Sequence, residues 1–345
     1  MTRQRDKPAA SGRTTMHDIA VHAKVSLGTV SHVLNETAPV REALKTRVLQ
    51  SIEELGYAVN NLSRGLRRNQ TNLIGVVIPD IMNPFFPAVV RGVEDLAFKS
   101  NYRVLLCNAD NDVKKEAAYL QDLQSFLSAG IILIPSLDHK IVKEGMPPVV
   151  CVDRKPKGWD GDSVTVANAE GGYLAAQHLI QMGHRQIGIV RGPSNVATAT
   201  ERVEGFLKAM HEHQISIPSE YMQSGLFDQE SGYTCTLRLL NLLPRPTAIF
   251  TASDLMAVGT LAAIKAQKLK CPKDVSIISF DGLPFTEMTE PAITSIFQPS
   301  YQLGYSAVRL LLERINGLDS LPQDIVLNTE LKIKDSVRRL NGTLA

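Results

Sequence analysis

Residues 14–35 read T-T-M-H-D-I-A-V-H-A-K-V-S-L-G-T-V-S-H-V-L-N, which has the spacing of two short amphipathic helices joined by a tight turn. Thr15 and Asp18 stand three residues apart, as in the capping box that begins a helix. Ser26 ends a three-residue turn and is placed to cap a second helix. Apolar side chains recur at helical spacing on one face of each segment, at Ile19, Ala20, Ala23, Val30, Val33 and Leu34. The stretch therefore predicts a helix-turn-helix.

A third helix is expected over residues 41–55, because apolar residues repeat there at helical spacing and Gly56 can cap its C-terminus. On the outer face of the second helix, small or polar side chains can lie in a major groove and contact base edges and phosphates. Helical spacing alone also fits any small three-helix domain, and on its own His32 fits an ordinary surface histidine better than a base contact. The candidate DNA contacts of this region are Thr15, Ser26, Leu27, Gly28, Thr29, Ser31, His32 and Asn35.

Composition is that of an ordinary globular protein, with 345 residues, 44% apolar and 21% charged, which predicts two or three domains. The net charge of +2 divides into +5 over residues 1–71 and −3 over the rest, so the basic part is the candidate phosphate-binding part, although a solvated basic face gives the same count. No apolar run resembles a secretory signal or a membrane span, so we expect a cytoplasmic protein without membrane contact. Four widely spaced cysteines favour reduced thiols over a metal site.

Three motifs are more specific than periodicity. They are A-x-x-A-x-V-S-x-x-T-V-S-x-V-L-N at 20–35, N-P-F-F at 83–86 and G-H-R-Q-I-G at 183–188. Together with the opening L-I-G-V-V-I-P-D at 73–80, they resemble the LacI/GalR family of bacterial transcription regulators, from about residue 14 to near 336. The resemblance implies a repressor that needs no cofactor or metal. The implied partners are double-stranded DNA with a palindromic operator, a small-molecule effector and further copies of the chain, in a homodimer or, alternatively, a tetramer.

The segment 59–71 is short, basic and too polar to fold alone. The resemblance implies that it becomes a hinge helix when two subunits bind the operator, with Leu66 wedged between base pairs in the minor groove. Val59 stands where the family usually has proline, and Gly65 is costly inside a helix. The implied hinge contacts are Asn60, Arg64 and Leu66.

From residue 73 onward, apolar runs alternate with helical segments, which predicts two doubly wound lobes with parallel sheets. The fold class is therefore α/β, with an all-α helix-turn-helix headpiece and a core that, by the resemblance, is like periplasmic binding proteins. The expected division is a flexible tail at 1–13, the headpiece at 14–58, the hinge at 59–71, the core at 72–336 and a tail at 337–345. Within the core, the N-lobe covers about 72–168 and 299–328, and the C-lobe about 169–298 and 329–336.

Open α/β sheets bind ligands beyond the carboxyl ends of their strands, so polar and aromatic residues at these ends are candidate effector contacts. Arg202 and Asp281 can clamp a sugar edge, since arginine donates a fork of bonds and a carboxylate accepts from two hydroxyls. Asp254 is interpreted as a helix cap instead. Phe85 and Phe86 can each be a residue of the lobe core instead of an effector contact. From the residues near these strand ends, the resemblance to the LacI/GalR family selects the candidates Phe85, Phe86, Asp153, Thr198, Arg202, Phe227, Ser253, Asp281 and Gln298.

A sugar or sugar derivative is the favoured effector. In purine-binding members of the resembling family an arginine lies two residues before the threonine that matches Thr198, and here Val196 stands there. Three phenylalanines keep a purine as the alternative. A solute-binding protein would share the lobes but needs an export signal and no reading head. No phosphate loop, nucleophile elbow or zinc motif is present, so no catalytic residue is assigned.

Overall fold

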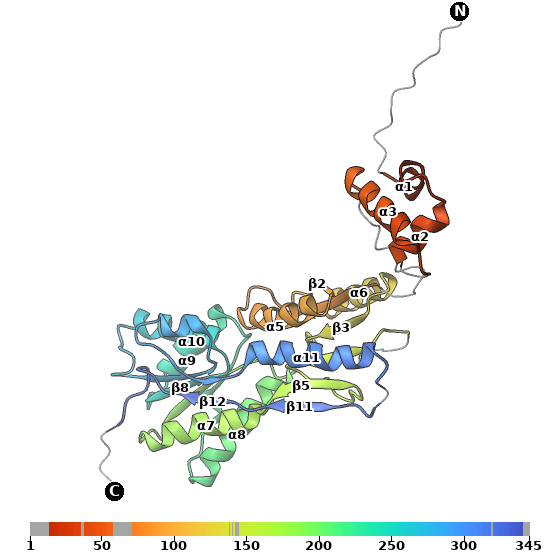
Figure 1. The fold of residues 1–345 in the computed structure, drawn as a ribbon. Helices are drawn as coiled ribbons and strands as arrows, with labels where there is room; N and C mark the ends of the chain where they lie inside the picture. The colour runs from red at the N-terminus through yellow and green to blue at the C-terminus, as the bar shows by residue number, and fades with distance from the viewer. Residues whose placement is uncertain are drawn as a thin grey trace, which may run out of the picture. The chain divides into compact units, whose positions relative to one another are not determined.

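The computed structural model describes residues 14–35, 38–57, 71–137, 139, 141, 145–318 and 320–340 (Figure 1). Of Asn35 it describes the backbone alone. The chain divides between Thr71 and Asn72 into two compact units, a headpiece and a larger core. None of the helices in these residues has both the length and the apolar character to cross a membrane. The four cysteines are free thiols, as expected, and three of them are buried.

The described residues of the headpiece form the helices α1 (Met16–His22), α2 (Leu27–Asn35) and α3 (Glu42–Glu54). The expected capping box is present, because the Asp18 amide donates to Thr15 Oγ1 and the Thr15 amide donates to the Asp18 carboxylate. Ser26 caps α2 as predicted, with its Oγ 3.1 Å from the Thr29 amide nitrogen. The core is formed by Ile19, Ala20, Ala23, Val30, Val33 and Val48.

The turn between α1 and α2 is held from α3. Lys24 in this turn has a φ of 52°, a left-handed conformation that is costly for a residue with a side chain. The Arg47 guanidinium donates to the carbonyls of Ala23 and Lys24, which are the last acceptors of α1 and its turn. Arg47 therefore fixes the angle between the two helices of the motif.

The N-lobe is built on a six-stranded sheet in the order β11-β5-β4-β3-β1-β2. All of its strand pairs are parallel. One face carries a core shared with α5 and α11, and the other a core shared with α6. The elements are β1 (Leu73–Ile78), α5 (Phe85–Lys99), β2 (Arg103–Asn108), α6 (Val113–Ser125), β3 (Gly130–Leu133), β4 (Val149–Val152), β5 (Asp162–Val166), α11 (Ser300–Ile315) and β11 (Asp324–Leu327).

The C-lobe repeats this plan with the order β12-β10-β9-β8-β6-β7. Figure 1 shows α9 and α10 on one side of its sheet and α7 and α8 on the other. The elements are α7 (Asn168–Gln181), β6 (Ile187–Arg191), α8 (Ala197–Glu212), η1 (Ser219–Tyr221), β7 (Met222–Ser224), α9 (Gln229–Leu240), β8 (Ala248–Thr251), α10 (Asp254–Ala266), β9 (Ser276–Asp281), η2 (Pro284–Glu287), β10 (Thr294–Phe297) and β12 (Glu330–Lys332).

Two details differ from the expectation. The sheets are not wholly parallel, because β12 pairs antiparallel with β10 after the chain returns from β11. The segment 337–340, assigned to a tail, packs on the C-lobe instead. The Leu340 amide donates to the Met182 carbonyl, the Arg338 amide donates to Ser276 Oγ, and Val337 packs against the C-lobe core.

Candidate DNA-reading helix and effector pocket

The outward face of α2 is available for contact. Leu27 at its start is 48% exposed, and Gly28 and His32 are exposed as well. Thr29 and Ser31 are half-buried, and Thr29 Oγ1 lies 2.9 Å from Ser26 Oγ. An exposed leucine at the N-terminal end of a helix, flanked by a glycine, suits contact with base edges in a groove. The side chain of Asn35 and the hinge candidates Asn60, Arg64 and Leu66 lie outside the described residues.

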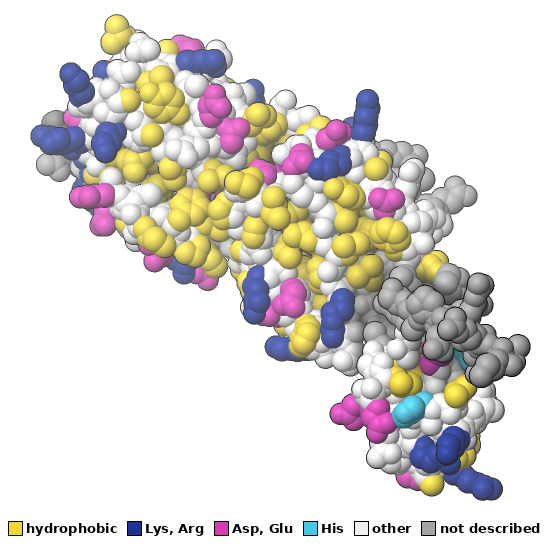
Figure 2. All heavy atoms as spheres, turned by 90° about the horizontal axis from the view of Figure 1, so that it is seen from above, with side chains coloured by type: hydrophobic (Ala, Val, Ile, Leu, Met, Phe, Trp, Pro, Cys, Tyr) yellow, Lys and Arg dark blue, Asp and Glu magenta, His cyan; other side chains and the backbone are white. Residues whose placement is uncertain are grey.

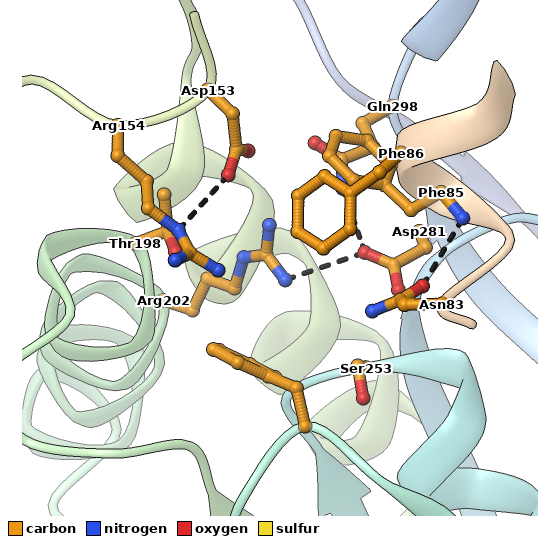
Figure 3. Close-up of a pocket in the computed structure, with 11 residues that line it drawn as sticks. Asn83, Phe85, Phe86, Asp153, Arg154, Thr198, Arg202, Ser253, Asp281 and Gln298 are labelled. Carbon is orange, nitrogen blue, oxygen red and sulfur yellow. Dashed lines mark hydrogen bonds and ion pairs between the residues drawn. The ribbon is translucent and has the colours of Figure 1, made fainter. Parts of the chain in front are cut away.

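One pocket of the core gathers all nine candidate effector contacts (Figure 3). Both lobes contribute. The N-lobe supplies the start of α5 and the loop after β4. The C-lobe supplies α8, the end of β9 and the loops after β7, β8 and β10. The lining residues are Asn83, Phe85, Phe86, Asp153, Arg154, Thr198, Arg202, Phe227, Ser253, Asp281 and Gln298.

Arg202 is placed by the contact between α7 and α8. A Cβ on Gly172 would lie 1.9 Å from the Arg202 carbonyl oxygen, so only glycine lets the two helices approach this closely. The Arg202 Nε donates to Asn168 Oδ1 at 2.9 Å, and its Nη1 donates to the Ala252 carbonyl at 2.7 Å. The guanidinium also lies 3.8 Å from the centre of the Phe280 ring. Figure 3 shows it pointing into the middle of the pocket.

Asp281 is the partner of Arg202 at the end of β9. Its Oδ1 accepts from Arg202 Nη1 at 3.3 Å and from Gln298 Nε2 at 2.6 Å. Burial raises the pKa of Asp281 to about 6, although the charge of Arg202 opposes this shift. Its φ of 121° is a strained conformation for a residue other than glycine.

Asp153 and Arg154 form the second charged pair of the pocket. Arg154 Nε is 3.3 Å from Asp153 Oδ2, and both residues are buried. Arg154 Nη1 donates to the carbonyls of Pro135 and Ser136, and the guanidinium faces the Phe86 ring. Burial raises the pKa of Asp153 and lowers that of Arg154, because each charge loses contact with water.

Three buried polar atoms of the pocket have no hydrogen-bond partner among the described residues. They are Asp153 Oδ1, Gln298 Oε1 and Arg154 Nε, whose approach to Asp153 lacks the alignment of a hydrogen bond. Leaving such a group unsatisfied costs about 1–3 kcal/mol. The two acceptors and one donor therefore have the chemistry to bind a ligand that carries both hydroxyl hydrogens and hydroxyl oxygens.

Apolar walls complete the pocket. Phe85 and Phe86 are 4% and 3% exposed and contact each other edge to face, with ring centres 5.2 Å apart. Both side chains belong to the N-lobe core and also line the pocket, so each of them fills the core and forms a pocket wall at the same time. Phe227 lines the pocket from the C-lobe.

The structure corrects the assignment of Asp254. The residue that caps α10 is Ser253, whose side chain accepts from the Met256 amide. The Asp254 carboxylate instead accepts from the Ser279 and Ser295 hydroxyls and from the Leu283 amide. Serine and aspartate can both cap a helix, so the sequence does not show whether Ser253 or Asp254 caps α10 and which of them bonds to residues far along the chain.

Two lining residues, Asn83 and Arg154, are missing from the sequence-based candidates. The Asn83 side chain accepts from the Phe85 amide and so shapes the start of α5. Arg154 pairs with Asp153, and its side chain also lines the pocket. The sequence could have indicated both residues, because they lie next to or near the candidates Phe85 and Asp153 and share their loops.

Comparison with known proteins agrees with this architecture. The sequence profile of bacterial regulatory proteins of the lacI family matches residues 15–60, and that of the periplasmic binding protein-like domain matches residues 176–337. The HTH-type transcriptional repressor PurR of Mannheimia succiniciproducens is 35% identical over 331 residues, 94% of this chain and 99% of the relative. The ribose operon repressor of Halalkalibacterium halodurans is 36% identical over 328 residues, with coverage of 94% and 97%.

A solved structure adds a further likeness. The LacI family regulator from Enterococcus faecium with bound ribose has a TM-score of 0.71 and 31% identity, and the match covers 78% of this chain and all of that one. A helix-turn-helix unit joined to a two-lobed binding core defines a DNA-binding regulator under the control of a small-molecule effector. The chain belongs to the LacI family of bacterial regulatory proteins, and its relatives are transcriptional repressors.

Proposed function

We propose that the effector is an uncharged monosaccharide that binds in the pocket between the lobes and controls operator affinity. The observation that carries this proposal is the pairing of charges. Each arginine of the pocket already faces a carboxylate, Arg202 with Asp281 and Arg154 with Asp153. An anionic ligand would need a cation without such a partner, whereas sugar hydroxyls can bond to both members of each pair. The phenylalanines can pack against the C–H face of a sugar ring.

Two similar proteins favour a sugar as the effector, since one is named a ribose operon repressor and the structure of the other was solved with bound ribose. Relatives named PurR supply the competing purine. Purine-binding members of the family have an arginine where this chain has Val196. Val196 precedes α8 and offers only an apolar side chain. We therefore favour the sugar, and we assign binding and not catalysis to the pocket.

A thermal-shift panel tests the effector class. The panel contains D-ribose, D-glucose, D-fructose, D-gluconate, ribose 5-phosphate, hypoxanthine and guanine. We expect a neutral sugar to raise the melting temperature, because a ligand at 100 times its Kd stabilises the folded state by about 2.7 kcal/mol. A shift with hypoxanthine or guanine alone would establish the purine. A shift with ribose 5-phosphate or gluconate alone would overturn the argument from paired charges.

We propose further that α2 reads operator DNA and that Leu27 contacts base edges. Selection of binding sites from random duplexes should return a palindrome, and binding should fall steeply with salt because phosphate contacts release counterions. Leu27→Ala should lower the preference for the selected site over random DNA by about tenfold, the cost of one base contact. Val21→Ala is the control, since Val21 is 65% exposed on α1. If the preference for the selected site falls equally in the two variants, Leu27 does not contact base edges.

A homodimer is the oligomer that we propose for this function, because a palindromic site requires two copies of α2. Strand β2 lies at the edge of the N-lobe sheet. Figure 2, which looks down on the face where α5 and α6 lie in Figure 1, shows hydrophobic side chains gathered along the core. Phe98 of α5 and Leu106 of β2 are 57% and 37% exposed. Sedimentation equilibrium should give a dimer for the wild type and a monomer for Leu106→Glu if this edge is the interface.

A further inference from the structure

Asp254 is a buried carboxylate that does not line the effector pocket. It is the first residue of α10 and is fully buried. Ser279 of β9 and Ser295 of β10 donate to Oδ1, and the Leu283 amide donates to Oδ2 at 2.6 Å. Because these donors occupy both oxygens, the carboxylate joins two strands of the C-lobe to the segment 281–285 that follows β9.

The backbone of the segment 281–285 is strained at Asp281 and left-handed at Gly282, where glycine permits it. Asp281 and Gly282 have φ values of 121° and 71°. A Cβ on Gly282 would lie 2.7 Å from the Phe297 Cα, so the segment runs directly against β10. The Gly282 amide donates to Ser295 Oγ at 3.0 Å, and the next amide donates to Asp254. Strained backbone persists only where its surroundings fix it, and Asp254 and Ser295 supply these contacts.

The same segment touches the pocket and the N-lobe. At its start, Asp281 accepts from Arg202 and Gln298 in the pocket, and its other oxygen lies 3.3 Å from the Asp254 amide nitrogen. Two residues later, Leu283 is 4% exposed and belongs to the apolar core of the N-lobe, against which Phe285 also packs. The N-lobe core includes the pocket residues Phe85 and Phe86.

We infer that Asp254 is a positioning residue for effector binding. It holds the segment 281–285 so that Asp281 faces Arg202 while Leu283 stays in the N-lobe core, and it thereby links the pocket to the contact between the lobes. The inference rests on the proposed effector pocket for its binding consequence. Asp254 fixes the segment 281–285 in the protein without ligand, so this effect can be measured independently of effector binding.

Three variants test the inference. Asp254→Ala removes every acceptor. Asp254→Asn keeps the shape, with an amide oxygen for the Leu283 N–H and an amide NH₂ that donates to the serine hydroxyls. Thr260→Ala is the matched control, because Thr260 is a fully buried residue of the same helix whose hydroxyl bonds to Thr236 Oγ1 at 2.8 Å, away from the pocket. Circular dichroism and thermal melts establish that each variant is folded.

Hydrogen–deuterium exchange of the full chain without ligand is the first measurement. In Asp254→Ala, the amides of Gly282 and Leu283 should exchange at least tenfold faster than in the wild type, whereas Asp254→Asn and Thr260→Ala should leave them within threefold. Calorimetric titration with D-ribose, or with the panel sugar that binds, is the second. The affinity should fall at least tenfold in Asp254→Ala and return to within threefold in Asp254→Asn.

The outcomes separate the inference from the proposed function. Exchange in Asp254→Ala that matches the wild type or the Thr260→Ala control overturns the inference, whatever the protein binds. Unchanged sugar affinity with faster exchange also overturns it, because the segment would then be held without orienting Asp281. If no panel sugar binds the wild type, the proposed effector class fails, and the exchange of the Gly282 and Leu283 amides alone decides the role of Asp254.

Discussion

Replacing Arg202 with methionine should weaken sugar binding by at least about 100-fold. Arg202 is the central donor of the pocket, and its guanidinium is fixed by Asn168, Ala252 and Asp281 before any ligand arrives. A hydrogen bond to a charged group contributes about 1.5–3 kcal/mol, so the loss of two such bonds to a sugar costs about 3 kcal/mol or more. Calorimetric titration with the panel sugar measures the change. Arg185→Met, an exposed position of the same lobe, is the control.

The same substitution should also destabilise the core, and a second substitution distinguishes the two effects. Without Arg202, the buried carboxylate of Asp281 loses its counter-charge, and breaking a buried pair in this way costs about 3–5 kcal/mol. Adding Asp281→Asn removes the unpaired charge, and asparagine has the same shape as the aspartate that already adopts the φ of 121° here. The double variant should regain much of the stability in urea unfolding and still not bind sugar. Recovery of binding in the double variant would show that Arg202 acts only through stability.

The architecture and the positions of the pocket residues followed from the sequence for a physical reason. Apolar runs mark buried parallel strands, and the residues just beyond their carboxyl ends must meet at one edge of each sheet. Asp153 and Asp281 lie at such ends and could therefore be assigned to one pocket without coordinates. Phe86 and Arg202 lie within α5 and α8, and their assignment came from the resemblance to the LacI/GalR family. In the headpiece, capping residues such as Thr15 and Ser26 act within three residues, so their roles are local and predictable.

The misassigned features depend on partners far apart in the chain. Asp254 contacts Ser279 and Ser295, which are 25 and 41 residues away, and no local pattern indicates these contacts. The antiparallel pairing of β12 with β10 likewise follows from the return of the chain between the lobes and not from the composition of a three-residue strand. Arg154 reaches the pocket because the carbonyls of Pro135 and Ser136 hold its guanidinium, a contact between two loops.

Acidification between pH 6.5 and 4 should destabilise the core by about 3 kcal/mol through His184 alone. This ring is fully buried at the end of α7, where Nδ1 lies 2.9 Å from Thr247 Oγ1 and Nε2 lies 3.1 Å from the Arg338 carbonyl. Burial lowers its pKa from 6.5 to about 4. Above pH 6.5 the ring is neutral in both the folded and the unfolded chain. As the pH falls toward 4, only the unfolded chain gains a proton, so stability is lost across that window.

Urea unfolding of the wild type and of His184→Gln at pH 7.5, 6.5, 5.5 and 4.5 measures this contribution. The raised pKa values of Asp254 and Asp281 act in the opposite direction, because these carboxyls bind protons more readily in the folded chain. The difference between the two proteins therefore isolates the histidine. His184→Gln should lose about 2–3 kcal/mol less than the wild type over this range, whereas His211→Gln, at an exposed position, should follow the wild type. Parallel pH profiles for all three proteins would mean that the folded core accepts the His184 proton, and that the Thr247 hydroxyl serves as its acceptor.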